Sequence, residues 1–312
     1  MPSKRSRKLN FRIGRGDPAL APGELLLEMI TPTQLRASRL RGEQISEYQS
    51  RQFYELEAQR VTHQDKIRSA LQSVAGISVP LDGWCRSIKL CYSHVPLSCV
   101  GSLKQSGRFH YGADLGERFP AFPALYLAAD RPTAHCEMVG YTRKGETTNG
   151  FTAEELAMQS ATSIAWLAIS GVVNNVFDLT QPKNLKPFVE TTKGFKFTSD
   201  FRKFERACKI RPVRLANTTA VLVITFMDPA WRAVLQYADV PANGQVFGQL
   251  VASAGFDGIK YRSTRTRADA LVVFPRNLSN GGSVVRVTDS APGSQCTELN
   301  ADTHADAERE QR

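Results

Sequence analysis

The chain has 312 residues, 42% of them hydrophobic and 22% charged, with a formal charge of +10 at pH 7. This length suits one large α/β domain with extensions as well as it suits two domains. The start of the chain is charged, and the longest nearly apolar stretch, residues 163–173, is too short to cross a bilayer, so the sequence predicts a cytoplasmic protein without a membrane span.

The cysteines argue against a metal site. None of the six forms a C-x-x-C pair, and the loose group of Cys85, Cys91, His94 and Cys99 fits no zinc-binding spacing. We therefore expect free thiols, several of them buried, in a reducing compartment.

The first part of the chain predicts two different segments. Lysines and arginines crowd residues 1–16, which we interpret as a disordered, solvated leader; direct contact with nucleic acid is the less favoured alternative. Residues 17–80 are expected to form a mainly helical extension, because apolar side chains recur near helical spacing from residue 31 to residue 74. Gly42 is expected to separate two helices there.

Short strands are expected from Leu81 onward. Residues 124–129 predict a strand that ends at Asp130, which can cap a helix and would place Glu137 about two turns into it. Two strands broken at Gly171 are expected within residues 163–179. The apolar run of residues 220–226 predicts a further, buried strand.

The last elements complete a core domain of residues 81–278. A helix is expected from Pro229 to about Tyr237 and another over residues 245–254, followed by strands at 258–262 and 270–274. Residues 279–312 are rich in glycine, serine and acidic residues and predict a disordered tail. Neither a phosphate loop nor G-x-G-x-x-G occurs, so neither a nucleoside triphosphate hydrolase nor a Rossmann dehydrogenase is indicated.

Three separated motifs carry a family resemblance. They are Gly107-Arg108-Phe109, then Leu125-Tyr126-Leu127-Ala128 followed by Glu137, and Gly258-Ile259 followed by Tyr261, Ser263 and Arg265. Over about residues 90–278 the chain resembles the RES family, named for its Arg, Glu and Ser residues. Where that family often has Gly-Gly-Arg-(Trp/Phe)-Asn, this chain has Ser-Gly-Arg-Phe-His.

The resemblance implies both a fold and an activity. The fold is α/β, of the α+β kind, with a bent, mixed β-sheet like that of ADP-ribosyltransferases, here behind a helical N-terminal extension. The activity is cleavage of the nicotinamide–ribose bond of NAD, with inorganic phosphate as co-substrate and no cofactor. Members of the family act as toxins paired with an Xre-like antitoxin.

Other functions stay open. The same residues could transfer ADP-ribose to a protein, as a mono-ADP-ribosyltransferase does. The chain could also be a non-catalytic nucleic-acid-binding or interaction protein. The sequence does not decide whether the protein forms a homo-oligomer.

The resemblance assigns roles to particular residues. Glu137 would stabilise the positive charge that develops on the ribose as the glycosidic bond breaks. Arg108 would hold the pyrophosphate with parallel hydrogen bonds. Tyr126 would stack on the cationic nicotinamide ring, and Tyr111 is an alternative for this task. Strand alternation puts Tyr126 on the opposite face from Leu125.

Two further residues follow the strand at 258–262. Ser263 would orient the nicotinamide ribose or the attacking phosphate, and Arg265 would add positive charge. We do not expect Ser263 to be a nucleophile, because no histidine and carboxylate pair that could activate it is evident. The predicted catalytic set is therefore Glu137, Arg108 and Ser263, with no metal.

Overall fold

The structure is a computed structural model that describes residues 32–139 and 164–309. The predicted leader of residues 1–16 and the first part of the predicted extension lie outside the described residues. The chain divides into two units, residues 1–43 and residues 44–312. In the first unit the described residues form the start of a helix with mostly exposed side chains. Apart from the start of that helix, the features below belong to the second unit.

Helices make up much of the described chain. Their bounds are α1 (Pro32–Thr62), α2 (Gln64–Gln72), α3 (Val100–Lys104), α4 (Arg131–Val139), α6 (Lys186–Thr192), α7 (Ser199–Ala207), α8 (Thr219–Phe226), α9 (Trp231–Ala238) and α10 (Asn243–Ser253).

The strands form one mixed sheet. Their bounds are β1 (Ile77–Pro80), β2 (Trp84–Lys89), β3 (Leu125–Ala128), β4 (Ile164–Asp178), β5 (Gly258–Arg262), β6 (Asp269–Val273), β7 (Val284–Val287) and β8 (Glu298–Leu299). The order is β2-β3-β6-β5-β4-β7-β8, with β1 paired to β4. Only β4 and β5 run parallel among these pairs. This arrangement confirms the predicted α+β fold with a mixed sheet.

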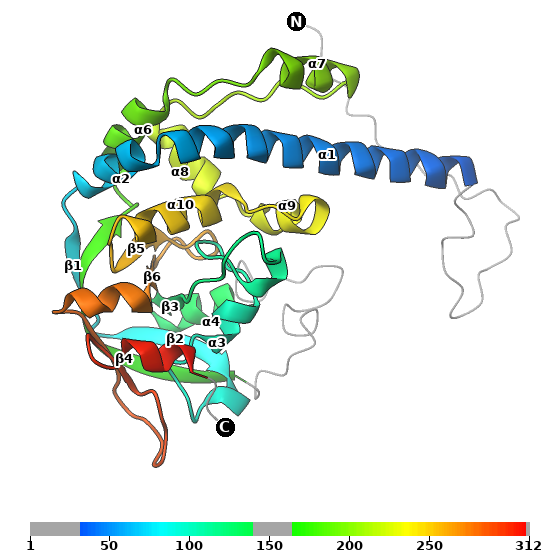
Figure 1. Ribbon diagram of the computed structural model, residues 1–312. Helices are drawn as coiled ribbons and strands as arrows, with labels where there is room; N and C mark the ends of the chain where they lie inside the picture. Colours follow the sequence, from blue (N-terminus) through cyan, green and yellow to red (C-terminus); the bar gives the residue numbers. More distant parts are fainter. Residues whose placement is uncertain (1–31, 140–163, 310–312) are drawn as a thin grey trace, which may run out of the picture. The chain divides into compact units, whose positions relative to one another are not determined.

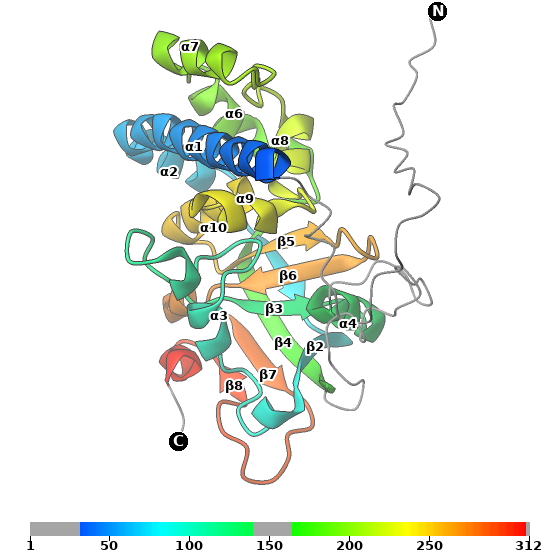
Figure 2. The same ribbon diagram turned by 90° about the vertical axis from the view of Figure 1, so that its right-hand side faces the viewer.

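The long strand β4 bends the sheet. Its first part pairs with β2 from Ile164 to Ile169, and its last three residues pair with β5. Because β2 also pairs with β3, the path β2-β3-β6-β5-β4 returns to β2. Figure 2 shows β3, β6 and β5 side by side with β4 crossing behind them.

Alternation along the strands divides the apolar side chains into two cores. Leu125 and Leu127 of β3 belong to one core, together with Leu271 and Val273 of β6. Tyr126 packs against the other core, which confirms the predicted alternation along this strand.

A layer of helices covers the second core. Phe247 and Val251 of α10 pack there with residues of β5 and β6, and α8 and α2 pack on α10 in turn. Figure 1 shows α8 and α10 stacked above β5 in this order. Phe247 stacks on Phe226 with 4.2 Å between ring centroids, so α8 and α10 are joined through aromatic rings.

The predicted strand over residues 220–226 is wrong, because this segment is helix α8. The Thr218 hydroxyl accepts a hydrogen bond from the Val221 amide and caps the helix. Leu222 and Phe226 are buried four residues apart, whereas Ile224 is 71% exposed. This one-sided burial is the period of a helix, and the β-branched composition of the run concealed it.

Two glycines that were expected to interrupt a helix and a strand lie inside α1 and β4 instead. Gly42 lies within α1, and the helix ends at Thr62 instead. Gly171 lies within β4 at φ 118°, where a side chain would come within 2.1 Å of the Val284 carbonyl oxygen. Glycine thus permits β7 to approach β4 closely, and it does not end the strand.

The predicted disordered tail is wrong over its described part. Residues 284–287 form β7, which pairs with β4, and β8 pairs with β7. Val285 and Leu299 are fully buried in the first core. The sequence predicted disorder here because the strands are short and the residues around them are mostly polar.

A buried carboxyl just before β5 predicts that the stability of the fold depends on pH. Asp257 is 2% exposed, burial raises its pKa to about 6, and Ser283 donates a hydrogen bond to it. Between about pH 4 and pH 6 this carboxyl is ionised only in the unfolded chain, so the free energy of unfolding should fall as pH rises, by roughly 3 kcal/mol at most. Urea unfolding at several pH values measures this loss.

Asp257→Asn should remove this pH dependence. Asp82→Asn changes an exposed carboxyl and should leave it in place. An unfolding free energy that is equally flat in the wild type would contradict the assignment to Asp257.

Candidate active site

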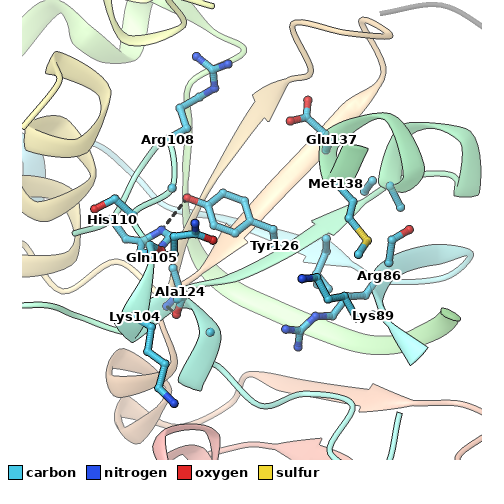
Figure 3. Close-up of a pocket in the computed structure, with 18 of the residues that line it drawn as sticks. Arg86, Lys89, Lys104, Gln105, Arg108, His110, Ala124, Tyr126, Glu137 and Met138 are labelled. Atoms are coloured by element: carbon cyan, nitrogen blue, oxygen red, sulfur yellow. Dashed lines mark hydrogen bonds between the residues drawn. The ribbon is translucent and has the colours of Figure 1, made fainter. Parts of the chain in front are cut away.

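A cavity of about 730 Å³ opens beside β3, between the loop that ends at His110, helix α4 and helix α9. Arg108, Tyr126, Glu137 and Arg265 all line it, so residues far apart in sequence meet there as predicted from their motifs. In Figure 3 Arg108 and Glu137 flank the ring of Tyr126. The volume of the cavity lies within the range of roughly 300–1,000 Å³ that is common for ligand pockets.

Glu137 is placed by the start of its helix. Asp130 accepts a hydrogen bond from the Thr133 amide at 2.7 Å, which confirms the predicted cap of α4. Seven residues later, two turns along the helix, the Glu137 carboxylate reaches the cavity.

Ser263 forms a hydrogen bond with the Glu137 carboxylate from a position outside the cavity lining. Its hydroxyl donates to Oε1 of Glu137 at 2.5 Å and accepts from the amides of Arg265 and Thr266 at 3.1 and 3.3 Å. Ser263 is fully buried and does not line the cavity. In this state the serine therefore orients Glu137 and has no surface through which it could touch a ligand directly.

Arg108 is buried, 7% exposed, and anchored by the protein. Its Nη1 donates to the Asp228 carbonyl oxygen at 2.8 Å and its Nη2 to the Thr264 hydroxyl at 3.2 Å. Since a guanidinium has five N–H donors, several remain for an anion in the cavity.

The Tyr126 hydroxyl is hydrogen-bonded to residues 105–110, the loop that carries Arg108 and is called the arginine loop below. The Gln105 carbonyl can only accept, so Nε2 of His110 carries the proton and donates to it at 3.0 Å. Burial lowers the pKa of His110 to about 4, and the neutral ring therefore accepts from the Tyr126 hydroxyl at Nδ1, at 2.9 Å. The same hydroxyl oxygen accepts from the Phe109 amide at 3.1 Å.

These bonds leave Tyr126 with its ring as the available contact. Burial raises the pKa of its hydroxyl above the ordinary value, so the group stays protonated. Tyr111, the alternative aromatic residue, lies outside the cavity lining and packs edge-on against Phe119 and Phe122. The structure thus brings Tyr126 and not Tyr111 to the site.

Helix α10 supports the arginine loop through residues that the sequence reading did not single out. The fully buried Gln245 donates to the carbonyl oxygens of Gly107 and His110 at 2.9 and 3.3 Å. A side chain at Gly248 would come within 2.0 Å of the Phe109 carbonyl oxygen, so loop and helix touch through backbone. The spacing of Gly244 and Gly248 by four residues was the available signal, because it puts two glycines on one helix face.

Arg232 of α9 is a second residue missed at the sequence level. It lines the cavity, and its guanidinium lies over the Trp231 ring, 4.3 Å from the centroid. Partial burial and the charges of Arg108 and Arg265 lower the pKa of Arg232, while Glu137 raises it. Three arginines and one carboxylate therefore share this end of the cavity.

Metal and membrane features give no further assignment. Over residues 32–139 and 164–309, no group of histidine, cysteine, aspartate or glutamate side chains is arranged to hold a metal ion. Within the same ranges no helix is both long and apolar enough to traverse a bilayer.

The search of curated proteins finds no match. A solved structure, described as the crystal structure of the M. tuberculosis MbcT–MbcA toxin–antitoxin complex, matches with 14% identity and a TM-score of 0.38, covering 78% of this chain and 97% of that one. The profile of the RES domain matches residues 185–293.

The matched segment contains Ser263 and Arg265, whereas Arg108, Tyr126 and Glu137 precede it. The fold brings both groups to one cavity. The resemblance to the RES family that the sequence predicted is therefore confirmed by a RES domain match over residues 185–293.

Proposed function

We propose that this chain cleaves the nicotinamide–ribose bond of NAD and transfers the ADP-ribosyl group to inorganic phosphate. The observation that carries the proposal is the Glu137 carboxylate, fixed by Ser263 at the arginine-rich end of a cavity of about 730 Å³. The RES domain match supports NAD as the substrate. NAD acts here as substrate and phosphate as co-substrate, with no separate cofactor, in a cytoplasmic enzyme.

The reaction breaks one bond and forms one. The electron pair of the bond between C1'' and nitrogen leaves with nicotinamide, which becomes neutral, and positive charge develops on the ribose carbon and ring oxygen. The Glu137 carboxylate stabilises this charge. A phosphate oxygen then bonds to C1'' and the phosphate releases its proton, giving ADP-ribose 1''-phosphate.

The other residues bind and orient the substrate. Arg108 holds the pyrophosphate with the N–H groups that Asp228 and Thr264 leave unused. The ring face of Tyr126 attracts nicotinamide while that ring is cationic, and this attraction weakens once the bond has broken. Ser263 acts through Glu137 by fixing one of its two carboxylate oxygens.

Incubation of the pure protein with NAD tests the proposal. NAD should disappear faster when phosphate is added, nicotinamide should form mole for mole, and chromatography with mass analysis should find ADP-ribose 1''-phosphate. ADP-ribose alone would indicate hydrolysis, and label on an added protein would indicate a mono-ADP-ribosyltransferase. Intact NAD after prolonged incubation would reject enzyme activity and favour a non-catalytic binding protein.

We also propose that the chain is the toxin of a toxin–antitoxin pair, with an Xre-like protein as its antitoxin. The RES domain match is the support for this role. Expression in bacteria should then deplete NAD and stop growth, and Glu137→Gln should relieve both effects. Growth arrest by the variant at equal protein levels would contradict a toxic role through NAD.

A further inference from the structure

The arginines that line the cavity differ in how the protein uses them. Arg86 donates to the carbonyl oxygens of Pro96 and Ser98, both at 2.9 Å, and Arg108 is anchored as described. The guanidinium groups of Arg232 and Arg265 make no hydrogen bond or ion pair with another described residue. Both of these arginines line the cavity.

Trp231 packs against one of them. Trp231 is 5% exposed, and the central carbon of the Arg232 guanidinium lies over its ring, 4.3 Å from the ring centroid. A guanidinium carries five N–H donors in a rigid planar fork. Arg232 brings such a fork to the lining of the cavity.

The charge at this end of the cavity is unbalanced. Arg108, Arg232 and Arg265 carry three positive charges, and Glu137 is the carboxylate beside them. Asp114, the other acidic residue among the described residues of the lining, already accepts from the amide and hydroxyl of Ser106. A net charge of about +2 in a partly desolvated site favours a doubly charged anion.

We propose that Arg232 and Arg265 form a phosphate-binding pair at the Glu137 end of the cavity, separate from the anchored Arg108. Guanidinium groups match phosphate oxygens through paired hydrogen bonds, and two of them can hold one doubly charged phosphate group. The inference rests on the proposed function for the identity of the phosphate. That phosphate is either the inorganic co-substrate or part of the NAD pyrophosphate.

Steady-state kinetics of Arg232→Ala and Arg265→Ala separate these two sources. Each variant should raise one KM at least about tenfold, which is the scale of losing a charge-assisted hydrogen bond. A raised KM for phosphate assigns the pair to the co-substrate, and a raised KM for NAD assigns it to the pyrophosphate. Arg232→Lys should recover little, because lysine lacks the planar fork.

Arg262→Ala is the matched control. Arg262 is exposed, pairs with Asp269 at 2.9 Å and does not line the cavity, so both KM values should stay as in the wild type. Unchanged KM values for NAD and for phosphate in both test variants would overturn the proposal.

A second measurement is independent of turnover. Inorganic phosphate and inorganic pyrophosphate, each tested alone, should raise the melting temperature of the wild type, and Arg232→Ala should abolish the shift given by the one that binds the pair. If the wild type does not consume NAD but shows this arginine-dependent shift, the proposed function fails and the phosphate site stands. If NAD is consumed and neither anion shifts the wild type, the phosphate site fails alone.

Discussion

Glu137→Gln should lower the turnover of NAD about 100- to 1,000-fold, or roughly 2.7–4 kcal/mol, the scale for removing one electrostatic stabiliser of a transition state. The amide that replaces the carboxylate carries no charge to balance the developing cation. It can still accept from Ser263, since the hydroxyl donates to Oε1. We therefore expect the fold and the binding of NAD to change little, as measured by thermal unfolding and by NAD titration.

Glu117→Gln is the matched control for this experiment. Glu117 is exposed and lies outside the cavity lining, so its replacement should leave turnover unchanged. Turnover within a few fold of the wild type in Glu137→Gln would remove this residue from the mechanism.

Gly248→Ala should destabilise the protein by about 1–3 kcal/mol, the usual cost of overpacking. Helix propensity alone would make Gly248→Ala stabilise the protein by about 1 kcal/mol. A loss of stability would therefore show that the close contact outweighs propensity. The added carbon would lie within 2.0 Å of the Phe109 carbonyl oxygen, and backbone on both sides leaves no flexible side chain to move. Urea unfolding measures the loss.

The same substitution should impair the site. Displacement of Phe109 from α10 moves Arg108 away from Asp228 and Thr264, so activity per folded molecule should fall as well. Gly194→Ala is the control, because nothing lies within 4 Å of the added carbon there. A Gly248→Ala protein as stable as the wild type would show that loop and helix are farther apart than described.

Local patterns predicted much of the fold. The strand at residues 258–262 has the predicted bounds, and the Asp130 cap sets the helix that carries Glu137. Local patterns failed at α8, where the seven-residue run of residues 220–226 fits either a strand or a helix. Only the Thr218 cap and the packing on Phe247 decide between them. Tertiary context commonly overrides propensity in such short runs.

The candidate site shows the same division. Arg108, Tyr126 and Glu137 were found because motif spacing marks them. Gln245 was not found, because it donates to backbone carbonyl oxygens of Gly107 and His110. Every residue has such an oxygen, so the sequence around Gln245 contains no sign of this contact. Arg232 resembles any charged residue at the start of a helix until the fold places it beside Arg265.

The position of β4 in the chain also sets the order in which the protein can be completed during synthesis. β1 and β2 leave the ribosome long before their partner, since Val79 pairs with Val173 and Trp84 with Ile169. Pairings of such wide sequence separation form slowly. A nascent chain that lacks the last third of the sequence also lacks Ser263 to hold Glu137. We therefore expect the cavity to be assembled only after Ser263 has been synthesised, so that shorter nascent chains are inert.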